Sequence, residues 1–327
     1  IRMKKKILVT GGLGFIGFHL TAKLLKNKNY QVLGIDNIND YYDTSLKKDR
    51  FKILKFDKKF LFKKIDKRKK NSLSNFIKEF DIKIIINLAA QAGVRNSINN
   101  PKAYLDNNII GFFNILEVAK ENKIDHLIFA STSSVYGNNK NFPLSENDNS
   151  DYPLSFYAAT KKANEVMAHS YSNIYKLPCT GLRFFTVYGP YGRPDMSLFK
   201  FTKAIYNSRY INLFNKGNHI RDFTYVDDIV LGISKVIDRP SKKLIPFEIY
   251  NVASGNPKSL KVFLNIIKKI TNLKPKIKLH QLQLGDIHKT HADIRKIEKA
   301  FNYKPKYDLQ LGIRNFIDWY KLYFDNK

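Results

Sequence analysis

The chain has 327 residues, enough for one large domain or two average ones. Hydrophobic residues make up 43% and charged residues 26%, as in an ordinary folded protein, and 16 Gly with 11 Pro exclude a collagen-like or low-complexity chain. The single cysteine, Cys179, cannot form an internal disulfide or a thiolate metal cluster. We therefore expect a reducing, cytoplasmic setting.

The apolar runs and the first residues give no targeting signal. No apolar run reaches the roughly 18 to 20 residues that a membrane span needs, so we expect no membrane association. The basic start leads directly into an apolar segment and does not have the pattern of a signal peptide. Ile1 and Arg2 precede Met3, so we expect the natural chain to begin at Met3.

The net charge of +29 would by itself favour a nucleic-acid partner. The lysines, however, are spread over the whole chain together with many Asn and Ile, which indicates a compositional bias. The densest stretch, 52–70, is interrupted by Asp57 and Asp66. A nucleic-acid interface would gather Arg and aromatic side chains on one face. We therefore expect no nucleic-acid partner, although the charge can steer an anionic small substrate.

The first half of the chain alternates short apolar runs with amphipathic stretches. We predict strands at 7–10, 31–35, 60–65, 84–88, 127–130 and 180–184, and helices at 14–26, 72–80, 101–122 and 154–175. Strands rich in Ile, Val and Phe, without polar alternation, are typical of a parallel sheet covered on both faces. The pattern predicts an α/β fold of the Rossmann type, with a doubly wound parallel sheet.

After residue 185, Gly and Pro residues become frequent and the predicted helices and strands become shorter. We predict helices at 196–206, 226–237 and 309–323, and one more sheet strand at 248–252. This arrangement predicts a dinucleotide-binding domain over 1–186, with a later segment near 226–256 interleaved into it. A smaller C-terminal α/β lobe over 187–327 is expected to hold most of the substrate site.

A glycine-rich turn lies between the first predicted strand and the first predicted helix. In TGGLGFIG, Gly11, Gly14 and Gly17 would let the backbone approach a pyrophosphate at the helix N-terminus. Asp36 ends the second strand, 36 − 17 = 19 residues past the last glycine, where a carboxylate binds an adenosine ribose. Because that carboxylate repels a 2′-phosphate, the pattern predicts NAD as the cofactor in preference to NADP.

A second motif pairs Tyr157 with Lys161, four residues apart and therefore on one face of a predicted helix. A phenol is a poor base at neutral pH, and a neighbouring ammonium lowers its pKa by stabilising the phenolate. Upstream, STSSVYG at 131–137 places a cluster of hydroxyls at a strand end. These hydroxyls could bond a sugar hydroxyl that is being oxidised.

The chain resembles, almost end to end, the extended short-chain dehydrogenases/reductases that modify nucleotide sugars. Three segments are similar to those of the UDP-glucuronate 4-epimerases: GIDNINDYYD at 34–43, AAQAGVR at 89–95 and RFFTVYGPYGRPDM at 183–196. The resemblance implies interconversion of UDP-glucuronate and UDP-galacturonate. In that reaction a C4 hydride passes to bound NAD and returns to the opposite face of a 4-keto sugar.

The resemblance also assigns roles to individual residues. Tyr157 would be the base and acid, Lys161 its partner and a ribose ligand, and Thr132 the hydroxyl that bonds the sugar O4. The remaining residues of the expected NAD site are Gly11, Gly14, Phe15, Ile16, Gly17, Asp36, Asn37, Asp66, Leu88, Ala89, Ala90 and Asn107. At Asp66, assigned to the adenine edge, the chain departs from the family, which more often has Gly and an aliphatic residue in place of the flanking Ile65 and Lys67.

The UDP-sugar site is expected to contain Arg95, Ser133, Ser134, Thr186, Arg193, Arg221 and Asp286. Within this set the resemblance assigns Arg221 to the diphosphate and Asp286 to the uridine ribose. Ser133, Ser134, Thr186 and Arg193 are the candidates for binding the uronate carboxylate, with Arg193 as the one cation. No metal site is expected, because His288 and His291 have no carboxylate or cysteine in ligand register. We also expect a homodimer.

Related activities remain as alternatives. A 4-epimerase of neutral UDP-sugars keeps similar small hydroxyl residues and is the first alternative. Nucleotide-sugar 4,6-dehydratases typically have Asp-Glu in place of Ser133 and Ser134, and UDP-glucuronate decarboxylases typically have Glu in place of Ser134. An NAD-sensing regulator on this fold would not need the Tyr157 and Lys161 pair.

Overall fold

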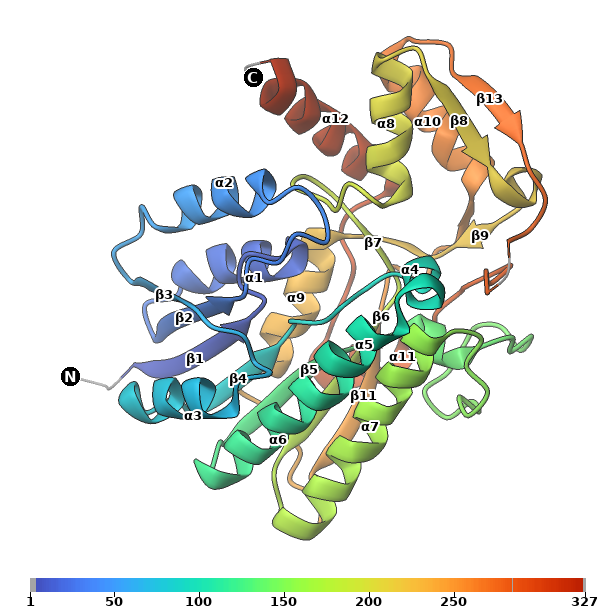
Figure 1. Cartoon of the computed structure of the whole chain (residues 1–327). Helices are drawn as coiled ribbons and strands as arrows, with labels where there is room; N and C mark the ends of the chain where they lie inside the picture. Colours follow the sequence, from blue (N-terminus) through green and yellow to red (C-terminus); the bar gives the residue numbers. More distant parts are fainter. Residues whose placement is uncertain (1–3, 284, 326–327) are drawn as a thin grey trace.

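Seven parallel strands form the central sheet, in the spatial order β3-β2-β1-β4-β5-β6-β11 (Figure 1). The computed structural model describes residues 4–283 and 285–325, so the expected start at Met3 lies outside the described residues. The strands are β1 (Lys5–Thr10), β2 (Tyr30–Asp36), β3 (Phe60–Lys64), β4 (Ile84–Asn87), β5 (His126–Thr132), β6 (Cys179–Phe184) and β11 (Phe247–Val252). The prediction of a doubly wound parallel sheet is confirmed. The strand order reverses between β1 and β4, where such sheets bind ligands.

The strands are apolar on both faces because helices cover both. In β1, Ile7 and Val9 pack into one hydrophobic core, whereas Leu8 between them packs into the core on the opposite face. One face is covered by α1 (Phe15–Leu25) and α9 (Val226–Val236), which contact each other. The other is covered by α3 (Lys70–Glu79), α6 (Gly111–Glu121) and α7 (Phe156–Tyr175).

The single helix predicted at 101–122 is divided in three. It consists of α5 (Pro101–Tyr104), a π-helical turn η1 (Leu105–Ile110) and α6. Inside the π turn, the buried Asn108 amide donates to the carbonyl of Gln91 and to the Thr160 hydroxyl and accepts from the Gln91 amide. The wider turn thus lets the helix bond the loop after β4, a contact that a hydrophobic pattern does not reveal.

The structure contains short helices that we did not predict: α2 (Ser45–Leu54), α4 (Val94–Asn99), α10 (Leu260–Thr271) and α11 (Arg295–Phe301). In α2 the inward positions include Lys47 and Arg50, which are both buried. The Arg50 guanidinium donates to the carbonyls of Leu13 and Tyr191. Because charged side chains occupy the inner face, the apolar periodicity of a surface helix is absent here.

The segments after β6 build a smaller lobe beside the carboxyl ends of the strands (Figure 1). Its helices are α8 (Ser197–Tyr206), α10 and α12 (Leu309–Asp325), and α10 packs against α12. Short paired strands complete it: β7 (Thr186–Tyr188) with β10 (Phe223–Tyr225), β8 (Tyr210–Leu213) with β13 (Lys276–Leu279), and β9 (Ile220–Arg221) with β12 (Lys258–Ser259). The chain returns from this lobe to the sheet to form β11. The domain boundary at residue 186 stays a prediction.

Across the described ranges, every helix is too short or too polar to traverse a lipid bilayer. Within the same ranges no three His, Cys, Asp or Glu side chains come together in a way that could hold a metal ion.

Candidate active site

A cavity of about 670 Å³ lies at the carboxyl edge of the sheet, between the sheet and the smaller lobe. It is lined by the segments that follow β1, β2, β3, β4 and β5, by the start of α7 and by the loops after β6 and β7. Every residue predicted for the site lines it, except Arg221. Its size and its place at the reversal of strand order are those of a site for a small molecule or cofactor.

The glycine turn after β1 leaves room for a ligand against the backbone. Gly11 has φ of +70°, and a Cβ added there would lie 2.9 Å from the Ala89 backbone nitrogen. A Cβ at Gly17 would collide with the Gly11 carbonyl. The extended Gly14 precedes α1 and supplies no side-chain cap to its amides. The turn therefore fits a pyrophosphate at the start of α1, as the sequence predicts.

Asp36 ends β2 at the rim of this turn and is buried. Its Oδ1 accepts hydrogen bonds from the Ile38 amide at 2.8 Å and from Lys47 Nζ at 3.4 Å. Lys47 also donates to the Asn39 side chain at 2.8 Å. Sequence reasoning missed Lys47, because it reaches Asp36 from α2. The carboxylate suits a ribose diol, and the lysine beside it reduces the local negative charge.

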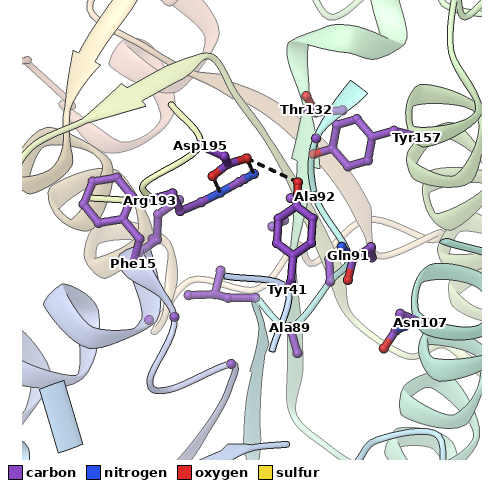
Figure 2. Close-up of a pocket in the computed structure, with 18 of the residues that line it drawn as sticks. Phe15, Tyr41, Ala89, Gln91, Ala92, Asn107, Thr132, Tyr157, Arg193 and Asp195 are labelled. Atoms are coloured by element: carbon purple, nitrogen blue, oxygen red, sulfur yellow. Dashed lines mark hydrogen bonds and ion pairs between the residues drawn. The ribbon is translucent and has the colours of Figure 1, made fainter. Parts of the chain in front are cut away.

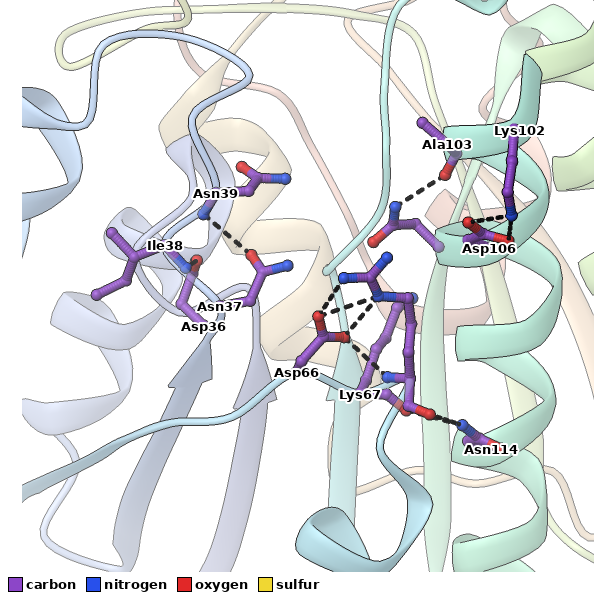
Figure 3. Close-up of polar contacts among 12 residues, drawn as sticks. Asp36, Asn37, Ile38, Asn39, Asp66, Lys67, Lys102, Ala103, Asp106 and Asn114 are labelled. Carbon is purple, nitrogen blue, oxygen red and sulfur yellow. Dashed lines mark hydrogen bonds and ion pairs between the residues drawn. The ribbon is translucent and has the colours of Figure 1, made fainter. Parts of the chain in front are cut away.

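Asp66, after β3, is engaged by its own neighbour. The Arg68 guanidinium donates to both carboxylate oxygens at 2.6 to 3.0 Å, and the Arg68 amide donates to Oδ1 at 2.9 Å (Figure 3). Asn37 and Asn107 line the same end of the cavity. Asn107 donates to the carbonyl of Ala103 at 2.8 Å. This end of the cavity, from Gly11 to Asp66, is hereafter the cofactor end.

Thr132, Tyr157 and Lys161 meet at the middle of the cavity. Thr132 ends β5, and its Oγ1 accepts from the Ser134 amide at 3.2 Å. Figure 2 shows Tyr157 beside Thr132, whose side chain acts to lower the pKa of the phenol. Lys161 lies one turn further along α7, where its Nζ donates to the carbonyl of Ala130 at 2.8 Å. The tyrosine and lysine thus share one face of α7, as predicted.

The electrostatics of this group differ in one respect from the expectation. Burial raises the pKa of the Tyr157 phenol above its ordinary value, while the hydrogen bond with Thr132 and the charge of Arg193 act to lower it. The cation that lowers the phenol pKa here is therefore Arg193 and not Lys161. Burial lowers the pKa of Lys161 to about 8, and the charge of Glu165 opposes this effect. At neutral pH Lys161 remains mostly protonated.

A buried ion pair holds α7 in place beneath these residues. Glu165 accepts from Ser131 Oγ at 2.6 Å and from Arg183 Nε and Nη2 at 2.9 and 2.8 Å. The side chains of Glu165 and Arg183 are each only 3% exposed. Ser131 belongs to β5 and Arg183 to β6, so this network ties α7 to both strands. It positions Tyr157 and Lys161 against Thr132.

The other end of the cavity, hereafter the sugar end, contains Ser133, Ser134, Thr186 and Arg193. Arg193 follows β7, and its Nε and Nη2 donate to Asp195 at 3.0 and 2.5 Å. The Tyr41 hydroxyl donates to the same carboxylate at 3.3 Å (Figure 2). Sequence reasoning missed Asp195 and Tyr41 as site residues. Both lie in loops, which have no periodic pattern, and Tyr41 is 154 residues away from Asp195 in the chain. Arg193 is thus held in place by an internal carboxylate.

Two further cations predicted for the sugar end have different surroundings. Arg95 lines the cavity, and its Nη2 donates to Asp286 at 2.9 Å. Arg221 lies outside the cavity lining, and its guanidinium donates to the carbonyls of Ile220, Ile287 and His288 at 2.5 to 3.0 Å. The structure therefore brings Arg95 and Asp286 to the site, while Arg221 supports the segment that carries Asp286.

Comparisons with known proteins agree with this geometry. Residues 7–253 match the family described as the NAD dependent epimerase/dehydratase family. The chain is 47% identical to Protein CapI of Staphylococcus aureus, over 98% of this chain and 99% of that protein. It is 43% identical to UDP-glucuronate 4-epimerase 2 of Arabidopsis thaliana, over 97% of this chain and 76% of that protein.

A solved structure is similar over the whole fold. It is that of UDP-glucuronic acid 4-epimerase from Bacillus cereus in complex with UDP-glucuronic acid and NAD. The match has a TM-score of 0.92 and 34% identity, and it covers 98% of this chain and 100% of that chain. The strand order, the glycine turn, the Tyr157 and Lys161 pair and these matches lead to one conclusion: the chain belongs to the NAD dependent epimerase/dehydratase family.

Proposed function

We propose that the protein is a UDP-glucuronate 4-epimerase that interconverts UDP-glucuronate and UDP-galacturonate with bound NAD. The observation that carries the proposal is the sugar end of the cavity, where Arg193 stands with neutral Ser133, Ser134 and Thr186 near the Tyr157 phenol. A guanidinium beside hydroxyl donors can bind a uronate carboxylate with the N–H groups that its ion pair with Asp195 leaves unused. The names of the similar proteins support the same substrate.

In the proposed reaction the protein holds the sugar and moves one proton. Tyr157 removes the proton from the C4 hydroxyl, and Thr132 bonds the same oxygen and lowers the pKa of the phenol. The charge of Arg193 acts to stabilise the phenolate, and protonated Lys161 would bond the nicotinamide ribose. Gly11, Gly14 and Gly17 would hold NAD along the turn, where it would supply the acceptor and then the donor of the C4 hydride. Tyr157 returns its proton to O4 after the ring has turned over.

The carboxylate of the oxidised sugar must be restrained. A 4-keto uronate is a β-keto acid, which loses carbon dioxide when its C5–C6 bond aligns with the carbonyl π system. Arg193 and the three hydroxyl side chains hold the carboxylate out of that alignment. Arg193 is itself fixed by Asp195 through two hydrogen bonds, so the guanidinium is preorganised before the substrate arrives.

The alternatives fit the cavity less well. A 4,6-dehydratase or a decarboxylase would need a carboxylate at Ser133 or Ser134, and both positions are serine. A neutral-sugar 4-epimerase would offer Arg193 no substrate carboxylate, and the guanidinium would be paired with Asp195 alone. A regulator that only senses NAD would not need the Tyr157, Lys161 and Thr132 arrangement.

One experiment separates these activities. Purified protein is incubated with UDP-glucuronate, and the nucleotide sugars are separated and identified. We expect UDP-galacturonate without net loss of carbon dioxide. A UDP-pentose product would identify a decarboxylase, and conversion of UDP-glucose alone would identify the neutral-sugar enzyme. No conversion of any UDP-sugar, with NAD bound, would favour the regulator.

We further propose a cytoplasmic homodimer formed through α6 and α7. These helices pack side by side (Figure 1), and apolar side chains on them are exposed: Leu105, Ile110 and Phe113 along the η1 and α6 run, and Val166 and Tyr175 on α7. Exposed apolar patches of this kind favour association. Sedimentation should give a dimer, and Phe113→Lys should shift it toward the monomer.

A further inference from the structure

A second lysine is buried in the cofactor end of the cavity. Lys67 follows Asp66 after β3, is 6% exposed and lines the cavity together with Asp36, Asp66 and Ala89. The resemblance to nucleotide-sugar enzymes gives it no role, because the family more often has an aliphatic residue there. A buried lysine has a desolvation cost that an aliphatic residue would avoid.

The surroundings of Lys67 leave its charge without a counterion. Its Nζ donates to the carbonyl of Ala89 at 2.5 Å. No carboxylate among the described residues forms an ion pair with it, because the adjacent Asp66 is occupied by Arg68 (Figure 3). The other charged group that acts on it is Lys161 of α7, which carries the same sign.

The neighbouring helix leaves space for the stem of this side chain. A Cβ at Gly111, the first residue of α6, would lie 2.8 Å from Lys67 Cε and 3.2 Å from its Cγ. On the same helix, Asn114 donates to the Lys67 carbonyl at 3.0 Å. The ammonium is therefore held at one place in the cavity by α6 and Ala89.

The location of Ala89 indicates which ligand would interact with the Lys67 ammonium. Ala89 lies directly against Gly11 of the turn that fits a pyrophosphate. A dinucleotide bound there is an anion, and it would bring the negative charge that the described side chains do not supply. Burial, followed by the charge of Lys161, lowers the pKa of Lys67 to about 7, while Asp66 acts to raise it. Without a bound anion, the lysine is therefore only partly charged near neutral pH.

We propose that Lys67 is a cofactor-binding residue whose protonated amine strengthens retention of NAD(H), so that this chain holds its cofactor more tightly in mildly acidic than in alkaline solution. The inference rests on the dinucleotide binding in the proposed function. Binding of the anion favours the protonated amine, so affinity is highest below the pKa of the free site and falls as pH rises above it. NADH and NAD⁺ carry the same pyrophosphate charge and differ only at the nicotinamide ring, so Lys67 strengthens the binding of both forms.

The test measures cofactor release and not turnover. The NADH-loaded protein is diluted at about pH 6 and at about pH 9, and release is followed by loss of NADH fluorescence. For the unmodified protein we expect release to be roughly tenfold faster at the higher pH. Lys67→Met should release NADH faster at the lower pH and lose most of this difference, with a residual part due to Lys161.

Three further variants make the result specific. Lys67→Arg keeps the charge at both pH values, so it should retain NADH well at each. Gly111→Ala should reproduce the weakening of Lys67→Met without a change of charge, because the new Cβ displaces the lysine stem. Lys69→Met removes the same charge from an exposed neighbour and should behave as the unmodified protein.

The outcomes separate this inference from the proposed function. Release from Lys67→Met that keeps the full pH dependence would overturn the role of Lys67. Equally weak retention by Lys67→Arg and Lys67→Met would also overturn it, by assigning the loss to packing. If Lys67→Met does not fold, the retention of NADH by Lys67→Arg and by Gly111→Ala still tests the role of Lys67. A protein that binds no NAD(H) at any pH would instead overturn the proposed function, and the inference with it.

Discussion

Polar side chains have different partners at the two ends of the central strands, here called the amino edge and the carboxyl edge of the sheet. At the amino edge, His126 begins β5 and bonds the Ile237 carbonyl and Thr180 hydroxyl at 3.0 and 2.8 Å, while Lys5 and Tyr30 both donate to Asp238. At the carboxyl edge, polar groups such as Tyr157 and Lys67 line a cavity of about 670 Å³. Groups that are paired within the chain stabilise the fold, whereas groups directed into a cavity can bind a ligand.

This contrast predicts that substitutions at the carboxyl edge change binding and turnover, and that substitutions at the amino edge change stability. The following predictions test the contrast from the largest expected effect to the smallest.

Tyr157→Phe should lose most turnover and keep its fold. Removing a general base or acid typically lowers the rate by roughly two to four orders of magnitude. Affinity for the UDP-sugar and the NAD content should stay close to those of the unmodified protein, as measured by calorimetry and absorbance. Tyr171→Phe removes a hydroxyl from the same helix, where it bonds Glu117, and serves as the control with normal turnover. A near-normal rate for Tyr157→Phe would refute its assignment.

Acid should destabilise the protein through His126. Burial lowers the pKa of His126 in the folded state to about 4, against an ordinary value of about 6.5. The folded protein thus prefers the neutral ring, and the unfolded chain takes up the proton. This stabilisation is complete above about pH 6.5 and is lost as pH falls toward 4, by about 3 kcal/mol in total.

The measurement is the urea midpoint as a function of pH. His126→Gln should be less stable at neutral pH and should show a shallower loss of stability between about pH 6.5 and 4. Turnover at neutral pH should change little, because His126 lies at the edge opposite the cavity. An unchanged acid slope in the variant would assign that slope to other groups.

Arg193→Ala should weaken UDP-glucuronate more than UDP-glucose. Loss of a charge-assisted hydrogen bond removes about 1.5 to 3 kcal/mol from binding of the carboxylate, which a neutral sugar does not contain. Some UDP-pentose should also form, because the carboxylate is less restrained. Dissociation constants for both nucleotide sugars provide the comparison. Equal weakening of the two would show that Arg193 contacts the diphosphate or only the fold.

The preference for NAD over NADP should depend on Asp36 and be limited by Lys47. We expect tighter binding of NAD, since the carboxylate accepts from a ribose hydroxyl and repels a phosphate. Asp36→Asn should narrow the difference by roughly tenfold, the value of about one net hydrogen bond. Titration with both cofactors provides the measurement. Equal affinities in the unmodified protein would mean that Lys47 neutralises Asp36 completely.

Much of the cofactor end could be predicted from the sequence, because its residues follow regular elements. Gly11, Gly14 and Gly17 lie between a strand and a helix, and Asp36 ends the next strand. A parallel sheet must bring these strand ends to one edge, so periodicity and spacing suffice to place them. The same reasoning placed Tyr157 and Lys161 on one face of α7.

The contacts that tune the site were decided by tertiary structure. Lys47 reaches Asp36 from a helix whose inner face is partly charged, so the periodic signal that identifies a surface helix was absent. Asp195 and Tyr41 meet at Arg193 from segments more than 150 residues apart. The expected influence of Lys161 on the Tyr157 phenol is exerted instead by Arg193, since pKa values follow distances and burial.

The sequence by itself determined the fold class, the order of the strands along the chain and the residue types at the ends of those strands, because each follows from local pattern. The tertiary structure decided which charges face one another across the cavity. Arg221 illustrates the difference: the family resemblance assigns it to a diphosphate, and only the structure shows its guanidinium donating to three backbone carbonyls outside the cavity lining. Whether a side chain is free to bind a ligand depends on the neighbours that satisfy it, and those neighbours come from distant parts of the chain.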